Sequence, residues 1–307
     1  MGVKVKWVQR GRYAGLMIRG KSSMDTNKYV GTHIDRVISL ASAVESSGLF
    51  GTVMNYDGTG MTAGIAQCIA LYPREIRNED NFAGDDQGPL WKLVEAVHDE
   101  HPDVTKELYK ALRKTGWSIK DGVIRRTTDG SIVSARILRE ILSPPNGVVP
   151  SHGLEWETTK RWGLMFHKLF SNPKTFDIQI ENAKEHIVSG INRKPRALKR
   201  KTAQELVYDR LPDNFLEKDE PLDLALACLW SNAVNAPAPA YQVLADVLTE
   251  RPNLSKESHR DAMAAKILLS LKNTERKNWQ KRYKRTRKAA MKIWPKKLFK
   301  GPLAVMS

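Results

Sequence analysis

The sequence has few cysteines, no long apolar run and fewer acidic than basic residues. Cys68 and Cys228 are the two cysteines among 307 residues, and both lie in apolar, helix-like surroundings. This setting favours buried free thiols over a disulfide framework. No apolar run approaches the roughly 18 residues of a membrane-spanning helix. The N-terminus lacks the apolar core of a signal peptide, so we expect a protein that is cytoplasmic until released, or virion-associated or exported by a non-classical route.

Motifs of several enzyme classes are missing as well. His98 and His101 have neither an H-E-x-x-H pattern nor a cysteine pair beside them, so we expect no zinc site, and no G-x-S-x-G motif supports a serine hydrolase. Residues 15–22 do fit the P-loop pattern G-x-x-x-x-G-K-S. The segment 23–31, however, has no helical apolar stripe, so a β-rich N-terminal arm is the preferred interpretation. We expect no cofactor.

Glu45 stands out among the residues that are present. Residues 32–44 carry apolar side chains at helical spacing, with Thr32 as a suitable N-cap. At about 100° per residue, Glu45 falls within about 20° of Ile34 and Ile38, in the middle of the apolar face. Burial there would disfavour the charged carboxylate, as a general acid near neutral pH requires. The alternative is a carboxylate at a fraying helix end, turned out to water.

The stretch after Glu45 is dense in turn-forming residues. Asn55-Tyr56-Asp57-Gly58-Thr59-Gly60 lies between two short segments of β type, which predicts a small irregular hairpin. After it, Thr62 can cap a second helix with apolar residues from Ile65 to Tyr72, ended by Pro73. A hairpin folded back beside the first helix could bring Asp57 across a groove from Glu45. Two carboxyl groups about 6.5–9.5 Å apart suit an inverting glycosidase.

These residues resemble the lysozyme superfamily. Glu45-Ser46, followed by a Gly-rich turn that ends in Ala63-Gly64-Ile65-Ala66-Gln67, looks like the catalytic Glu-Ser and the Gly-Leu-Met-Gln-like element of lytic transglycosylases and goose-type lysozymes. Residues 57–65 are similar to the Asp-Gly-x-Gly-x-Thr-x-Gly-Ile segment of the chitosanase branch. The similarity covers about 35 residues. It implies Glu45 as acid, Asp57 as general base and Thr62 as a hydroxyl that helps to hold the attacking water, with Tyr56 and Gln67 at the substrate.

The resemblance leaves the mechanism open. If Asp57 only supports the turn, Glu45 acts alone, as in a lytic transglycosylase. The formal net charge of +16 and the pI of about 9.8 argue against polycationic chitosan and for peptidoglycan, whose peptide and lactyl groups carry carboxylates. We therefore expect a glycoside hydrolase that cleaves β-1,4 bonds of peptidoglycan glycan strands. The non-enzymatic alternative is a basic protein with a lysozyme-like scaffold that binds nucleic acid or an assembly such as a virion.

The remainder of the chain reads as mainly α-helical. We expect a β-rich arm at 1–30, a lysozyme-like core at 31–192 with the hairpin beside the catalytic helix, a helical second lobe at 202–271 and a basic C-terminal segment at 272–307. The basic connector 193–201 marks the boundary between lobes. In the second lobe, Trp230 and Asn232 could line a sugar groove, although a core tryptophan is the commoner outcome. The basic segment could bind anionic wall polymer, lipopolysaccharide or nucleic acid, or be a solvated helix pinned by its aromatic residues.

Overall fold

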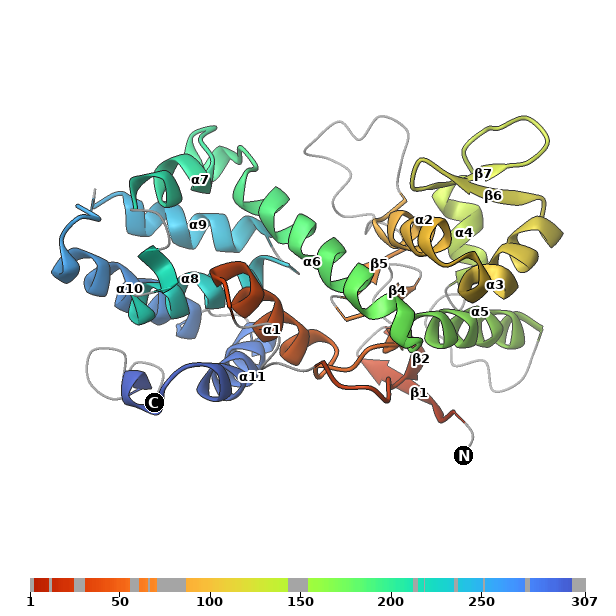
Figure 1. Cartoon of the computed structure of the whole chain (residues 1–307), viewed down its shortest axis with the longest axis horizontal. Coiled ribbons are helices and arrows are strands. Elements are labelled where there is room, and N and C mark those ends of the chain that lie inside the picture. Colours follow the sequence, from red (N-terminus) through yellow and green to blue (C-terminus); the bar gives the residue numbers. More distant parts are fainter. Residues whose placement is uncertain are drawn as a thin grey trace. The chain divides into compact units, whose positions relative to one another are not determined.

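The computed structural model in Figure 1 is mainly α-helical, with two small antiparallel sheets. It describes residues 3–10, 13–24, 31–55, 61–65, 67–70, 87–142, 154–211, 215–217, 219–234, 237–250, 252–273 and 277–299. The chain forms two compact units: unit 1 holds residues 1–24 and 48–182, and unit 2 holds 25–47 and 183–307. In the described segments, no helix combines the length and apolarity needed to cross a membrane.

Unit 1 contains a five-stranded sheet in the order β1-β2-β3-β4-β5, with every neighbouring pair antiparallel. The strands are β1 (Val5–Arg10), β2 (Tyr13–Ile18), β3 (Val53–Met54), β4 (Thr62–Ala63) and β5 (Cys68–Ile69). The predicted hairpin is confirmed, because β3 pairs with β4 on either side of the turn segment. The helix predicted after Thr62 is wrong. Gly64 and Gln67 both have positive φ angles, of 84° and 54°, which turn the chain back into β5 instead.

The P-loop interpretation is excluded by the same sheet. The first four residues of the pattern, from Gly15 to Ile18, lie inside β2. Both of its glycines are explained by close backbone packing: a Cβ at Gly15 would collide with Asn55, and one at Gly20 with the Phe50 carbonyl oxygen. The N-terminal segment is thus β-rich as expected, and it forms the edge of the sheet.

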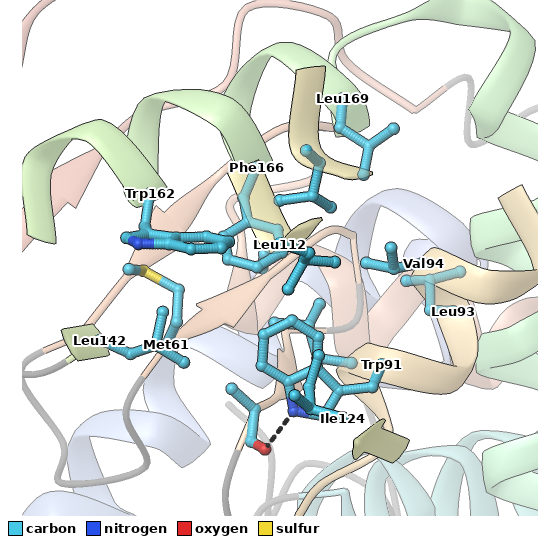
Figure 2. Close-up of a cluster of buried hydrophobic side chains, with 14 of the residues drawn as sticks. Met61, Trp91, Leu93, Val94, Leu112, Ile124, Leu142, Trp162, Phe166 and Leu169 are labelled. Carbon is cyan, nitrogen blue, oxygen red and sulfur yellow. Dashed lines mark hydrogen bonds between the residues drawn. The ribbon is translucent and has the colours of Figure 1, made fainter. Parts of the chain in front are cut away.

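The helices of unit 1 pack on this sheet and around one another. They are α2 (Leu90–Glu100), α3 (Pro102–Lys114), α4 (Ala135–Leu142) and α5 (Leu154–Phe170), and a hairpin of β6 (Trp117–Lys120) and β7 (Val123–Arg126) follows α3. Asp-Gly is a common two-residue hairpin turn in sequence, and Asp121 and Gly122 both have the positive φ angles that such a turn requires. Figure 2 shows the core, in which the ring of Phe166 of α5 packs against both Trp162 and Trp91. The indole NH of Trp91 donates to the Ala70 carbonyl oxygen over 3.0 Å.

Unit 2 is all helical in its described part. Its helices are α1 (His33–Glu45), α7 (Ala203–Leu206), α8 (Glu220–Ala233), α9 (Pro237–Leu248), α10 (Glu257–Lys272) and α11 (Lys277–Ile293). Helix α6 (Phe176–Ile191) begins in unit 1 and ends in unit 2. Thr32 caps α1 as predicted: its hydroxyl accepts from the Asp35 NH, and the Asp35 carboxylate accepts from the Thr32 NH. Helix α8 is buried nearly all round, and α1, α10 and α11 pack against it.

The division into units differs from the predicted domains in three places. Helix α1 joins the C-terminal helices, because its apolar side chains pack on α8 and α11. The boundary between the units falls between Asn182 and Ala183, inside α6, and not at the basic connector 193–201. The basic C-terminal segment is also part of unit 2, since Tyr283, Ala290 and Trp294 are buried. The alternative of a solvated basic helix pinned by its aromatic residues is therefore confirmed at Tyr283 and Trp294.

Candidate functional site

Glu45 is the last residue of α1, two positions before the chain leaves unit 2 at Ser47. Only 10% of its side chain is exposed, as its position in the apolar face of the helix predicts. Its carboxylate forms an ion pair with the Nη2 atom of Arg282 in α11, so the expected apolar surrounding that would disfavour the charged form is not found. The alternative of a carboxylate turned out to water is therefore excluded.

Arg282 connects this acid to α8. Its Nε donates to Asn232 Oδ1 over 3.0 Å, and its Nη2 donates to the Ser231 carbonyl oxygen over 2.8 Å. The arginine is 8% exposed, so these acceptors stand in for the water that its guanidinium has lost. Glu45 and Asn232, which the sequence analysis proposed separately as site residues, therefore both contact the guanidinium of Arg282. Sequence reasoning missed Arg282, because it is one of many basic residues in α11.

The structure corrects the sugar-binding assignments on α8. Trp230 is 2% exposed, its indole NH donates to the Tyr208 hydroxyl over 2.7 Å, and its ring packs edge-on against Tyr241. Its ring faces are thus not open for stacking on a sugar. Asn232 is also 2% exposed, and its Nδ2 donates to the Cys228 carbonyl oxygen over 2.7 Å. Its amide holds Arg282 in place and is not open to an N-acetyl group.

Thr62 and Gln67 lie in unit 1, at the end of the β3–β4 hairpin and in the turn after it. The Thr62 hydroxyl donates to the Met54 carbonyl oxygen over 3.0 Å, so toward a water molecule it can act only as an acceptor. Gln67 Nε2 donates to the Thr52 and Gly64 carbonyl oxygens over 3.1 and 2.8 Å. Its Oε1 is buried and accepts no hydrogen bond from the described residues. Tyr56 and Asp57 lie outside the described residues.

A second buried polar cluster in unit 2 was not predicted. Asp223 of α8 is 2% exposed and accepts from His33 Nδ1 over 2.6 Å, from Arg36 Nε over 2.7 Å and from Trp294 Nε1 over 2.7 Å. His33 Nε2 lies 3.0 Å from the Tyr208 hydroxyl. Burial, together with the nearby Asp223 charge, raises the pKa of Tyr208 far above its ordinary value of 10.0. Asp223 is an acid with apolar neighbours on both sides in α8, a signal similar to the one that drew attention to Glu45.

The two cysteines, Cys68 and Cys228, are free thiols, as expected, and Cys228 is buried. Burial raises the pKa of Cys68 to about 12, which makes it a poor nucleophile near neutral pH. Within the described ranges, no group of three or more His, Cys, Asp or Glu side chains is placed to hold a metal ion.

Comparisons with known proteins gave no relatives. A scan against protein-family models, a search of curated proteins and a search of solved structures each found no match for this chain. The function is therefore inferred from the residues of the chain itself.

Proposed function

We propose that this protein is a peptidoglycan-degrading glycoside hydrolase with a lysozyme-like fold, and that Glu45 protonates the leaving oxygen of a β-1,4 glycan bond. The observation that carries the proposal is the buried carboxyl group of Glu45, at the end of a helix and followed in the sequence, after residues 46–52, by the β3–β4 hairpin. The residues that resemble the lysozyme superfamily lie in this order of helix, acid and hairpin. Asp219 and Asp223 of the same unit are also buried beside arginines, so Glu45 is distinguished by its position ahead of the segment that resembles the lysozyme superfamily.

The ion pair with Arg282 shapes how Glu45 would work. A carboxyl group that donates a proton must first hold one, and then it no longer neutralises the guanidinium. Arg282 keeps its bonds to Asn232 and to the Ser231 carbonyl oxygen, which hold it in place in that step. Arg282 would thus be a positioning residue, held by α8 whether or not Glu45 carries a proton.

The role of Asp57 determines whether the reaction is hydrolysis or transglycosylation. As general base it would activate a water molecule held with the help of Thr62, whose hydroxyl oxygen can accept from that water. Inversion of the anomeric centre would follow. If Asp57 only accepts hydrogen bonds in the turn, the sugar's own hydroxyl closes a ring and the product is a 1,6-anhydro sugar. We favour hydrolysis, because Thr62 matches the water-holding position of the chitosanase branch.

The test is a digest of purified peptidoglycan, with the products separated and weighed by mass spectrometry. We expect soluble muropeptides with reducing ends, each heavier by one water than the anhydro product. Asp57→Asn should then be nearly as damaging as loss of Glu45. Anhydro products from an active Asp57→Asn enzyme would overturn hydrolysis and leave Glu45 as the single catalytic carboxyl. Absence of any soluble glycan product would overturn the proposed function.

Helix α11 favours a second activity, the binding of polyanions. Lys281, Lys284, Lys288 and Lys292 are exposed and recur at intervals of three or four residues, so they share one face of the helix. No acid occurs in residues 277–293, and within the described residues none of the four lysines is in an ion pair. The opposite face packs into unit 2 through Tyr283, Ala290 and Trp294, so deletion of the segment would damage the fold.

Substitution of the four lysines by glutamine is therefore the better test. Binding to anionic wall polymer or to DNA should weaken, and its dependence on salt should flatten, by about 0.9 in log–log slope for each DNA phosphate that no longer pairs with a lysine. The matched control neutralises the exposed residues Lys194, Arg196, Lys199 and Lys201 of the connector. An equal loss in the control would mean that net charge, and not the α11 face, attracts the polymer.

A further inference from the structure

Helices α3 and α5 lie side by side in unit 1 and enclose an open groove of about 770 Å³. Helix α3 contributes Glu107, Lys110, Ala111 and Lys114. Helix α5 contributes Glu157, Lys160, Arg161, Leu164, Met165 and Lys168. Both sets follow helical spacing, so each helix presents one continuous face to the groove. The volume is in the range of small-ligand sites.

The charges of the groove do not balance. Lys168 reaches across from α5 to Glu107 of α3 over 2.7 Å, and Lys160 lies 3.4 Å from Glu157. These two pairs use both acids of the groove. Lys110, Lys114 and Arg161 remain, and no acid among the described residues forms an ion pair with them. The groove therefore presents three uncompensated cations.

The floor between these cations is apolar. Ala111 is 8% exposed, and Leu164 and Met165 are half-buried, with their inner sides on the hydrophobic core of unit 1. A phosphate polymer needs cations and polar donors along its backbone, and it gains nothing from an apolar floor. A short peptide with carboxylates and methyl groups uses both features: the carboxylates pair with the cations and the methyl groups cover the floor.

We propose that this groove binds the acidic stem peptides of peptidoglycan, whose alanine methyl groups and free carboxylates fit its floor and its cations. This inference rests on the proposed function, because it names a second part of the same polymer. The glycan is cleaved with Glu45 of unit 2, and the peptide is held by α3 and α5 of unit 1. Such a contact raises the affinity for the polymer without a part in the chemical step.

The probe is a soluble stem tetrapeptide, titrated into the full-length protein by calorimetry or by NMR. Lys110→Gln, Lys114→Gln and Arg161→Gln together should weaken its binding about tenfold, since an exposed ion pair contributes up to roughly fivefold in affinity. A control with Lys106→Gln, Arg113→Gln and Lys120→Gln removes equal charge from exposed positions of unit 1 outside the groove, and it should weaken binding less than about twofold, because salt screens distant charges.

Two further probes address the chemistry of the ligand. A tetrapeptide with its carboxylates amidated should bind about tenfold more weakly than the free acid. Met165→Gln, which keeps the size of the side chain and makes the floor polar, should also weaken binding. Equal loss in the two triple variants would overturn the inference. So would a DNA oligonucleotide that binds more tightly than the peptide and depends on the same three cations.

The failure of this inference can be told apart from failure of the proposed function. The groove triple variant should cleave glycan strands stripped of peptide at the parent rate, and Glu45→Gln should still bind the tetrapeptide. If the protein cleaves stripped glycan but ignores the tetrapeptide, the groove inference is wrong and the function stands. If it binds the tetrapeptide but cleaves no glycan, the function is wrong and the groove is a peptide site of another activity.

Discussion

The two units stabilise their buried polar groups in different ways. In unit 1, the side chains of Gln87, Gln179 and His167 hydrogen-bond to backbone groups of short strands and turns. In unit 2, several of the buried groups are charged, and they pair across helices, as at Asp223 and Arg282. The strands of unit 1 are too short to satisfy their own backbone, whereas helices satisfy theirs internally. Neutral amides therefore brace the irregular sheet, and ion pairs hold the helices together.

The largest effect on stability should come from Asp223→Asn in unit 2. Asparagine keeps the shape but removes the charge that Arg36 and His33 face. Removal of one partner from a buried ion pair costs about 3–5 kcal/mol of unfolding free energy. Urea denaturation followed by tryptophan fluorescence would measure the loss. A loss below about 1 kcal/mol would mean that charge is unimportant in the core of unit 2.

A smaller effect is expected from Gln87→Met in unit 1. Gln87 accepts from the Ile124 NH over 2.7 Å and donates to the Ile124 and Val133 carbonyl oxygens over 3.1 and 2.9 Å. Methionine has a similar size but leaves these backbone groups unpaired, at a cost of about 1–3 kcal/mol. The same denaturation experiment applies. A loss as large as that of Asp223→Asn would erase the difference between the two units.

The smallest effect concerns the pH dependence of unit 1. Burial lowers the pKa of His167 below its ordinary 6.5, although its hydrogen bond to the Gly51 carbonyl oxygen acts in the opposite direction. The unfolded chain then binds a proton more readily than the folded one, so stability falls as the pH drops below 6.5. His167→Gln can still donate to Gly51 and should reduce this loss. Unfolding free energies at about pH 7 and pH 5 would show it, and an unchanged pH dependence would contradict it.

Local patterns predicted much of the fold. The cap at Thr32, the burial of Glu45 and the hairpins around residues 55–61 and 121–122 follow from spacing and turn chemistry. Long-range packing could not be predicted in the same way. The segment from Ile65 to Ile69 has a helical apolar pattern, but Gly64 and Gln67 turn it into a strand. The bond from Gln179 to the Ile65 NH, which stabilises that turn, comes from far along the chain.

The candidate site was predicted only in part. Glu45 was found because the spacing of apolar residues in the sequence is enough to place an acid on the apolar face of a helix. Arg282 was not, because its buried position in α11 depends on packing against α1 and α8. Trp230 was assigned to a sugar groove on residue type, and the structure places it in the core.

Glu45 is proposed to be the catalytic acid. Its ion pair with Arg282 has a closely similar counterpart in unit 2. Arg260 pairs with Asp219 over 2.6 Å, with 10% and 8% of the two side chains exposed, against 9% and 10% for Arg282 and Glu45. Glu45→Gln and Asp219→Asn each remove one buried carboxylate and should destabilise unit 2 to a similar extent. The rate of peptidoglycan cleavage by the two folded variants is the decisive measurement. We predict a loss of about 10²–10⁴-fold for Glu45→Gln and a nearly parental rate for Asp219→Asn. Equal rates for the two variants would show that Glu45 is a structural ion-pair partner and not the catalytic acid.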